Sequence, residues 1–205
     1  MDSMAASATD ETASPRRQAI LDAAKAVFFE EGYPTASMDR IAARAGVTKR
    51  TVYAHFGTKH ALFSAVVARA CANVTAQIPT PDSLSDDPAV GLPLALNHSR
   101  ELMESPNCIR LERIVAAETE RHPEFAATLR GAFASGEAML AGALARWVAA
   151  GRLKPHDVSL AARMLNDQVG YATSLRGLLG EVSDPVAARG SVNEAVRLYL
   201  GAYAV

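Results

Sequence analysis

Residues 38–56 read MDRIAARAGVTKRTVYAHF, and this stretch decides the fold. A short helix is predicted on each side of Gly46, because Ser37 and Thr48 are good N-cap residues and glycine accepts the positive φ of a sharp turn. Two helices of one or two turns are unstable alone, so they must pack on each other and on a third helix. The apolar residues predicted to form their shared core are Ile41, Val47 and Val52. This is the arrangement of a helix-turn-helix.

The outer face of the second short helix carries only neutral and cationic side chains. Its residues are Thr48, Lys49, Arg50, Thr51, Tyr53, Ala54 and His55. A solvated structural helix normally mixes both signs of charge, whereas a face of hydrogen-bond donors fits phosphates and base edges. The surrounding residues 15–70 hold nine Lys/Arg against four Asp/Glu, although the whole chain has a net charge of −1. A polyanionic partner is therefore expected for this part of the chain alone.

The remaining sequence predicts helices throughout. Alanine makes up a fifth of the chain and aromatic residues only 6%, which favours an all-α fold. Residues 1–14 are predicted to form a disordered tail, and residues 15–78 a helix-turn-helix DNA-binding domain. The Ser14-Pro15 pair is expected to cap the first helix. A turn-rich stretch at 79–88 separates this domain from a helical bundle that extends to residue 205. The helices expected in the bundle are 88–104, 107–121, 123–150, 156–179 and 185–203, with a kink or later start at Pro93.

Several classes of protein are excluded by the sequence. No uncharged run approaches the about 18 apolar residues of a membrane span. The first 14 residues resemble no secretory signal, and two widely spaced cysteines fit a reducing compartment, so a cytoplasmic location is expected. No catalytic set, phosphate-binding glycine loop or cofactor motif occurs, and the spacing of the histidines with Cys108 predicts no metal site. No enzymatic activity and no cofactor are therefore expected.

The stretch GYPTASMDRIAARAGVTKRTVYAHFGTKHALF resembles the DNA-binding domain of TetR/AcrR transcriptional regulators. The resemblance covers about residues 16–67. The residues that carry it are Ala23, Ala24, Phe28, Gly32, Tyr33, Ile41, Ala42, Ala45, Gly46, Tyr53, Phe56, Lys59 and Leu62. Two positions depart from the family pattern: Arg50 stands where glycine is common and His60 where an acid is common. The C-terminal part, from RLERIVAAETERHPEFAATLR onward, is more weakly similar to the AefR-type domain of the same family.

The resemblance implies a homodimer on a near-palindromic operator in double-stranded DNA, with one recognition helix in the major groove of each half-site. Base or nearby phosphate contacts are expected from residues 49–51, and a phosphate or minor-groove contact from Arg16 and Arg17. Backbone contacts are expected from Thr35, Ser37, Arg44, Tyr53, His55 and Lys59. The full set of predicted DNA-binding residues is Arg16, Thr35, Ser37, Arg44, Thr48, Lys49, Arg50, Thr51, Tyr53, His55 and Lys59. For Tyr53 the alternative is core packing, and for Lys49 and Arg50 a solvated helix start.

The bundle is expected to supply the dimer interface and an effector site. Apolar and small residues of 156–179 and 185–203 predict a four-helix bundle across a two-fold axis. The predicted interface residues are Leu165, Val169, Gly170, Ala172, Ser174, Gly177, Val192, Val196 and Tyr199. A small apolar or amphipathic effector is expected to contact Met103, Phe125, Phe133, Met139, Trp147, Asn166, Gln168 and Tyr171. In both cases the alternative is plain packing inside one subunit.

Three functions remain open at this point. The first is a repressor that a small-molecule ligand releases from its operator. The second is a small-molecule-binding helical enzyme or carrier with an incidental DNA-binding module. The third is a DNA-bound protein without an effector. The sequence identifies neither operator nor effector, and it does not separate repression from activation.

Overall fold

A computed structural model of the chain describes residues 14–205, except for the side chains of residues 171–173. Apart from Ser14, the predicted tail lies outside the described residues. Within them every regular element is a helix, and one isolated bridge joins Leu153 to Ala204, so the predicted all-α class is confirmed. None of the described helices combines the length and the apolar character needed to cross a membrane. The chain divides into two compact units, the first ending at Ala70 and including Ile114–Ala126, the second containing the rest.

The first unit is built on α2 (Pro15–Thr35), α3 (Met38–Ala45), α4 (Lys49–Phe56) and the start of α5 (Lys59–Thr75). Helix α2 begins with Pro15 as predicted, but the Ser14 side chain forms no capping hydrogen bond. Its regular part ends at Gly32, which adopts φ 78° and interrupts the helix. The first unit therefore contains the helices that the sequence assigns to a DNA-binding domain.

Aromatic rings fill the core of the first unit. The Phe28 and Phe63 ring centroids lie 4.8 Å apart, and those of Phe63 and Phe125 lie 4.7 Å apart. All three side chains are fully buried. Phe125 was predicted to contact an effector in the bundle, and the structure instead packs its ring in the core of the first unit, which is the alternative of plain packing. Edge-to-face rings of this kind add specific attraction to the burial of their area.

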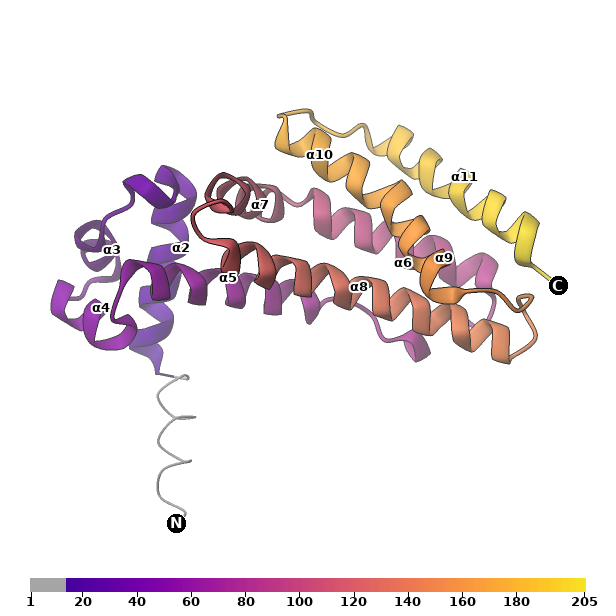
Figure 1. The fold of residues 1–205 in the computed structure, drawn as a ribbon, viewed down its shortest axis with the longest axis horizontal. Coiled ribbons are helices and arrows are strands. Elements are labelled where there is room, and N and C mark those ends of the chain that lie inside the picture. The colour runs from indigo at the N-terminus through magenta and orange to yellow at the C-terminus, as the bar shows by residue number, and fades with distance from the viewer. Residues whose placement is uncertain (1–13) are drawn as a thin grey trace, which may run out of the picture. The chain divides into compact units, whose positions relative to one another are not determined.

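The second unit contains the 3-10 turn Pro81–Ser83 and the helices α6 (Pro88–Glu104), α7 (Pro106–Glu118), α8 (Pro123–Ala149), α9 (Val158–Asn166), α10 (Ala172–Leu178) and α11 (Pro185–Tyr203). The first residues of α8 and the last of α7 belong to the first unit. Helix α6 runs through Pro93 without a later start. In the second unit α10 and α11 both pack on α6 (Figure 1). Asp184 caps α11 by accepting from the Val186 amide at 2.9 Å.

The predicted helix 156–179 is two helices in the structure. A π-helical turn, Asp167–Tyr171, separates α9 from α10. A π turn holds one extra residue, so it changes which residues after it face the core. A periodicity counted across one continuous helix therefore does not apply beyond the turn.

Candidate nucleic-acid interface

Local hydrogen bonds define the ends of α3 and α4. The Ser37 Oγ accepts from the Arg40 amide at 3.2 Å, and the Thr48 Oγ1 accepts from the Thr51 amide at 3.2 Å. Between the helices Gly46 adopts φ 66°, a conformation that favours glycine. Both predicted caps and the predicted turn are confirmed.

A small core beneath the turn fixes the position of α4. Ile41 and Val52 are fully buried, Ala42 is 4% exposed and Val47 is half-buried. The Phe56 ring, also buried, packs beneath the Arg17 guanidinium at 4.9 Å. Because α4 is anchored by these side chains, its opposite face is held rigidly toward solvent.

The exposed face of α4 is rich in hydrogen-bond donors. Thr48, Lys49 and Arg50 are exposed, and Tyr53 is 43% exposed, which excludes the core-packing alternative for this tyrosine. No acidic residue occurs in α4. The Arg50 guanidinium has no hydrogen-bond or ion-pair partner within the described part of the chain. Arginine with free donors at a helix start suits bidentate contact with a guanine or a phosphate.

Lys49 is paired in the structure. Its Nζ donates to the Asp39 Oδ2 at 2.8 Å, and this hydrogen bond raises the pKa of the Lys49 ammonium above its usual range. Both side chains are more than half exposed. A pair of this kind contributes little to stability, so a phosphate can replace the carboxylate at low cost.

Other predicted backbone-contact residues also have partners inside the chain. Arg44 donates through Nη1 to both carboxylate oxygens of Glu30, at 2.6 and 2.7 Å. Lys59 donates to the Pro34 carbonyl at 2.9 Å and lies 4.9 Å from the centre of the Tyr33 ring. Burial lowers the pKa of Lys59. Of the other predicted contacts, Arg16 and Thr35 are exposed, and Thr51 and His55 are half-buried.

Comparison with known proteins identifies both parts of the chain. The model for bacterial regulatory proteins of the tetR family matches residues 20–66, and the model for the AefR-like transcriptional repressor C-terminal domain matches residues 92–205. The chain belongs to the TetR family. The first of these matches contains the helix-turn-helix, in which α4 is the second helix.

Curated relatives share the DNA-binding part. The regulator is 48% identical over 56 residues to TtgW of Pseudomonas putida and 44% identical over 63 residues to the activator FasR of Mycolicibacterium smegmatis. These matches span 27% and 31% of the chain, and only 42% and 29% of the two relatives.

Solved structures share the whole fold. A TetR-family protein from Mesorhizobium loti has a TM-score of 0.83 at 23% identity, with 93% of this chain and 97% of that chain covered. The repressor SmeT of the Stenotrophomonas maltophilia efflux pump SmeDEF has a TM-score of 0.68 at 27% identity, with 95% and 93% covered.

The residues predicted to form the dimer interface are packed inside the subunit of this regulator. Most lie in a single core shared by α6, α8, α9 and α11. The buried members of the predicted set are Leu165, Val169, Ser174, Val192, Val196 and Tyr199. The glycines face neighbours in the same chain, since a Cβ on Gly170 would lie 2.8 Å from the Met103 Sδ and one on Gly177 would lie 2.7 Å from the Ile109 Cδ1. These residues therefore pack within one subunit, which is the alternative that the sequence left open, and their burial leaves them little surface to offer a partner. The Ala172 side chain lies outside the described residues.

The predicted effector residues are divided between the two units, with Phe125 in the first and the others in the second. Trp147 is fully buried in the core of the second unit, where its Nε1 donates to the Ser85 carbonyl at 3.0 Å. Gln168 is exposed, Phe125 belongs to the first unit, and the Tyr171 side chain lies outside the described residues. Met103, Phe133 and Met139 are half-buried. Among the members of the set whose side chains are described, Asn166 alone presents a buried polar atom without a partner, its Nδ2.

The second unit exposes large apolar side chains that are absent from the predicted interface residues. We call this group of side chains the α9–α11 face. Its residues are Leu160, Met164, Leu175, Leu179, Val186 and Leu198, between 51% and 76% exposed. The i,i+4 pairs 160/164 and 175/179 are a sequence signal for it. The buried apolar residues of the same helices have an equally regular spacing. Spacing alone therefore does not distinguish the exposed residues from the buried ones.

Proposed function

We propose that this chain is a homodimeric repressor that a small-molecule effector releases from a near-palindromic operator. The observation that carries the proposal is the exposed donor face of α4, with Arg50 unpaired within the described chain, on a rigid helix-turn-helix. Arg50 and Lys49 are proposed to contact base edges or nearby phosphates. Arg16, Thr35, Arg44, Tyr53, His55 and Lys59 are proposed to contact the backbone of the duplex. Ser37, Thr48 and Thr51 are proposed to assist mainly by shaping the helix starts.

The α9–α11 face is the proposed dimer interface. It places six large apolar side chains in water, and exposed apolar side chains that gather on neighbouring helices mark an interaction site. A second copy of the chain buries the same face by two-fold symmetry. Two recognition helices then reach half-sites about 34–36 Å apart, one turn of DNA.

Unpaired polar atoms in the second unit support an effector site. Asn97 Oδ1 and Arg100 Nε of α6, and Asn166 Nδ2 of α9, are buried without a hydrogen-bond partner. The Ser99 hydroxyl lies 3.5 Å from the Asn166 Oδ1, which links the two helices. Buried polar atoms are normally satisfied, so a ligand with its own donors and acceptors explains these exceptions. The effector is proposed to be small and amphipathic, in line with the name of one structural neighbour, a flavonoid-responsive regulator 26% identical to this chain.

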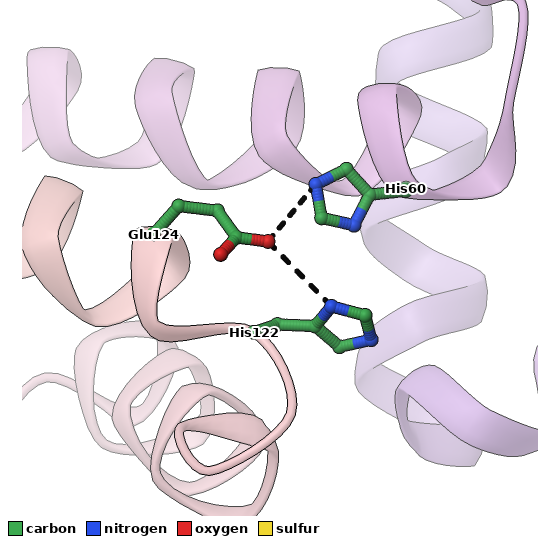
Figure 2. A group of neighbouring side chains, drawn as sticks. All are labelled: His60, His122 and Glu124. Atoms are coloured by element: carbon green, nitrogen blue, oxygen red, sulfur yellow. Dashed lines mark ion pairs between the residues drawn. The ribbon is translucent and has the colours of Figure 1, made fainter.

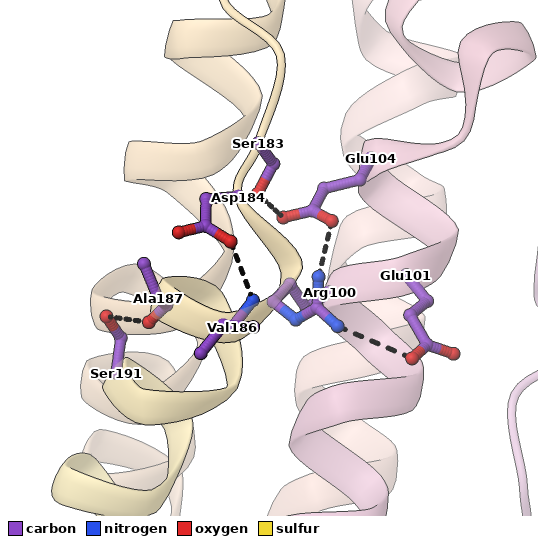
Figure 3. Close-up of polar contacts among 8 residues, drawn as sticks. All are labelled: Arg100, Glu101, Glu104, Ser183, Asp184, Val186, Ala187 and Ser191. Carbon is purple, nitrogen blue, oxygen red and sulfur yellow. Dashed lines mark hydrogen bonds and ion pairs between the residues drawn. The ribbon is translucent and has the colours of Figure 1, made fainter.

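Arg100 connects this proposed site to the dimer face. Its guanidinium pairs with Glu104 and Glu101, and the other Glu104 oxygen accepts from the Ser183 hydroxyl at 3.1 Å (Figure 3). Ser183 precedes the cap of α11. An effector that engages Arg100 is proposed to change this contact and so shift the dimer between two geometries. A 100-fold loss of operator affinity needs about 2.7 kcal/mol of differential binding.

The test is selection of bound genomic fragments by the purified protein, followed by a reporter gene under the recovered site. The expected result is one near-palindromic site, lower reporter expression with the protein present, and relief by one compound from a library chosen with the neighbouring genes in mind. Asn166→Leu is expected to abolish that relief and to keep repression. Higher expression with the protein present contradicts repression, and unchanged DNA affinity across all compounds contradicts the effector.

A further inference from the structure

Two histidines and a glutamate meet at the junction before α8. His60 is the second residue of α5, while His122 and Glu124 flank Pro123 at the start of α8. The Glu124 Oε1 lies 3.0 Å from the His60 Nε2 and 3.5 Å from the His122 Nδ1 (Figure 2). The three ligand-type atoms all lie within 4.8 Å of one another, inside the first unit. One carboxylate oxygen thus faces two imidazole nitrogens from distant parts of the sequence.

Aromatic packing holds both imidazoles in place. The Phe125 ring centroid lies 4.9 Å from that of His60 and 5.1 Å from that of His122. The Tyr33 ring meets His122 edge-on at 5.3 Å. Phe125 is itself fully buried in the core of the first unit. The cluster is therefore built on a rigid wall, although its own side chains remain 28–50% exposed.

The ligand set and spacing fit a transition metal. Two imidazoles and one carboxylate suit Zn²⁺ and its neighbours, whereas Mg²⁺ and Ca²⁺ prefer oxygen ligands throughout. Ligand bonds of about 2.0–2.1 Å in a tetrahedron place the ligand atoms about 3.3 Å apart. The two measured separations lie on either side of this value. Partial exposure leaves the fourth position to water, as in open zinc sites.

The surrounding charges favour a cation. The nearest lysine in sequence, Lys59, directs its ammonium to the Pro34 carbonyl and the Tyr33 ring. Glu118, only 4% exposed, interacts electrostatically with both Lys59 and Tyr33 and adds negative charge to this part of the unit. We propose that His60, His122 and Glu124 bind one divalent transition-metal ion of the zinc class per subunit.

The position of the site links it to DNA binding. Three residues, 57–59, separate α4 from His60. An ion joining His60 to His122 and Glu124 fixes the start of α5 against the 122–124 segment and so restricts the helix that follows the recognition helix. If zinc changes operator affinity by some factor, the operator changes zinc affinity by the same factor.

Zinc binding is measured first without DNA, so its failure is distinguishable from failure of the proposed repressor function. Tag-free protein is titrated with Zn²⁺ in competition with a chromophoric chelator and by calorimetry. His60→Gln, His122→Gln and Glu124→Gln are compared with His98→Gln, which removes an imidazole bonded to the Gln77 carbonyl in the second unit. Circular dichroism melting of each protein without metal verifies that it is folded.

The expected result is one zinc per subunit in the wild type and in His98→Gln. Each cluster variant is expected to lose at least about 10-fold in affinity, the scale already reached by losing an outer partner of a metal ligand. His60 is the more exposed of the two imidazoles in the cluster. If a variant at His122 fails to fold, His60→Gln is therefore used to test zinc binding. Retention of wild-type affinity in folded His60→Gln overturns the proposal, as does wild-type binding no tighter than that of a His60→Gln/Glu124→Gln double variant.

Discussion

The α4 face and the α9–α11 face are both exposed, and their chemistry is opposite. The first is a short rigid helix with threonines, Lys49 and Arg50 toward solvent and no acid. The second holds leucines, a methionine and a valine that are more than half exposed. Each face lacks the partner that its chemistry calls for: a polyanion in one case, an apolar surface in the other.

The difference predicts how each association responds to solution conditions. Contacts with phosphates release counterions and weaken as salt is added. Burial of apolar surface is insensitive to charge screening and is strengthened by excluded salts such as sulfate. A protein that joins the two faces into one function therefore has one salt-sensitive and one salt-resistant step.

The largest expected effect is on operator binding between about 50 and 200 mM salt. A dimer with six or more phosphate contacts is expected to lose about 10³-fold or more in affinity over this range. Over the same range the dimer dissociation constant, measured by sedimentation, is expected to stay nearly constant. Fluorescence anisotropy with a labelled operator gives the first quantity. A flat operator-binding curve would falsify the assignment of α4 as a phosphate-contacting helix.

The next largest effect comes from charging the apolar face. Leu175→Asp with Leu179→Asp is expected to give monomers, because burying unpaired carboxylates is costly. Loss of the linked second half-site lowers operator affinity by about 10²–10⁴-fold. Leu94→Asp is the matched control, since Leu94 is 60% exposed and belongs to α6, which contributes no residue to this face. A dimeric double variant with normal operator binding contradicts the proposed interface.

The helix-turn-helix could be predicted because its determinants are local. Ser37, Gly46 and Thr48 specify caps and a turn within a few residues, and the structure contains each of them. The pairing of Arg44 with Glu30 and of Lys49 with Asp39 depends on how α2, α3 and α4 pack. No local pattern encodes these ion pairs, so the availability of the cationic side chains was overestimated from sequence.

The bundle was harder to predict because its helices are apolar on more than one side. Leu165 packs inward, whereas Leu160 and Met164 on the same helix are more than half exposed. The spacing of apolar residues predicts both stripes, but it does not show which of them faces the core. The π turn at Asp167–Tyr171 then alters the register, so the face assigned before it does not continue after it. The cluster of His60, His122 and Glu124 could not be predicted from the sequence for a different reason: His60 and His122 are adjacent only in the folded chain.

A smaller effect separates the cations within the α4 face. Arg50→Ala is expected to cost about 1–3 kcal/mol of operator binding and to relax the preference at one base pair, if the arginine reads a base. Lys49→Ala is expected to weaken all sequences alike and to lower the salt slope by about 1. Arg152→Ala, an exposed arginine of the second unit, is the control. Equal binding by the wild type and Arg50→Ala/Lys49→Ala would show that another surface contacts the operator.

The smallest effect concerns the inner side of α10, where Ser174 is buried next to the exposed Leu175. There the Ser174 hydroxyl donates to the buried Glu112, and the Cys108 thiol lies 3.5 Å from the other carboxylate oxygen. Burial raises the pKa of Glu112 despite these two hydrogen bonds, and burial together with Glu112 raises the pKa of Cys108 to about 12.

Because the raised pKa of Glu112 disfavours its charged form in the folded chain, its contribution to stability is present at low pH and is lost as the pH rises through that pKa. Glu112→Gln keeps the shape and cannot ionise. Its melting temperature is therefore expected to exceed that of the wild type by a few degrees at pH ~8 and by less at pH ~5. Thermal melts of both proteins across this range, with Glu101→Gln as an exposed control, measure the difference. If the difference in melting temperature between Glu112→Gln and the wild type grows toward low pH, the charged carboxylate stabilises α10. The inner side of α10 would then not be uncharged, in contradiction to the comparison with its apolar outer side.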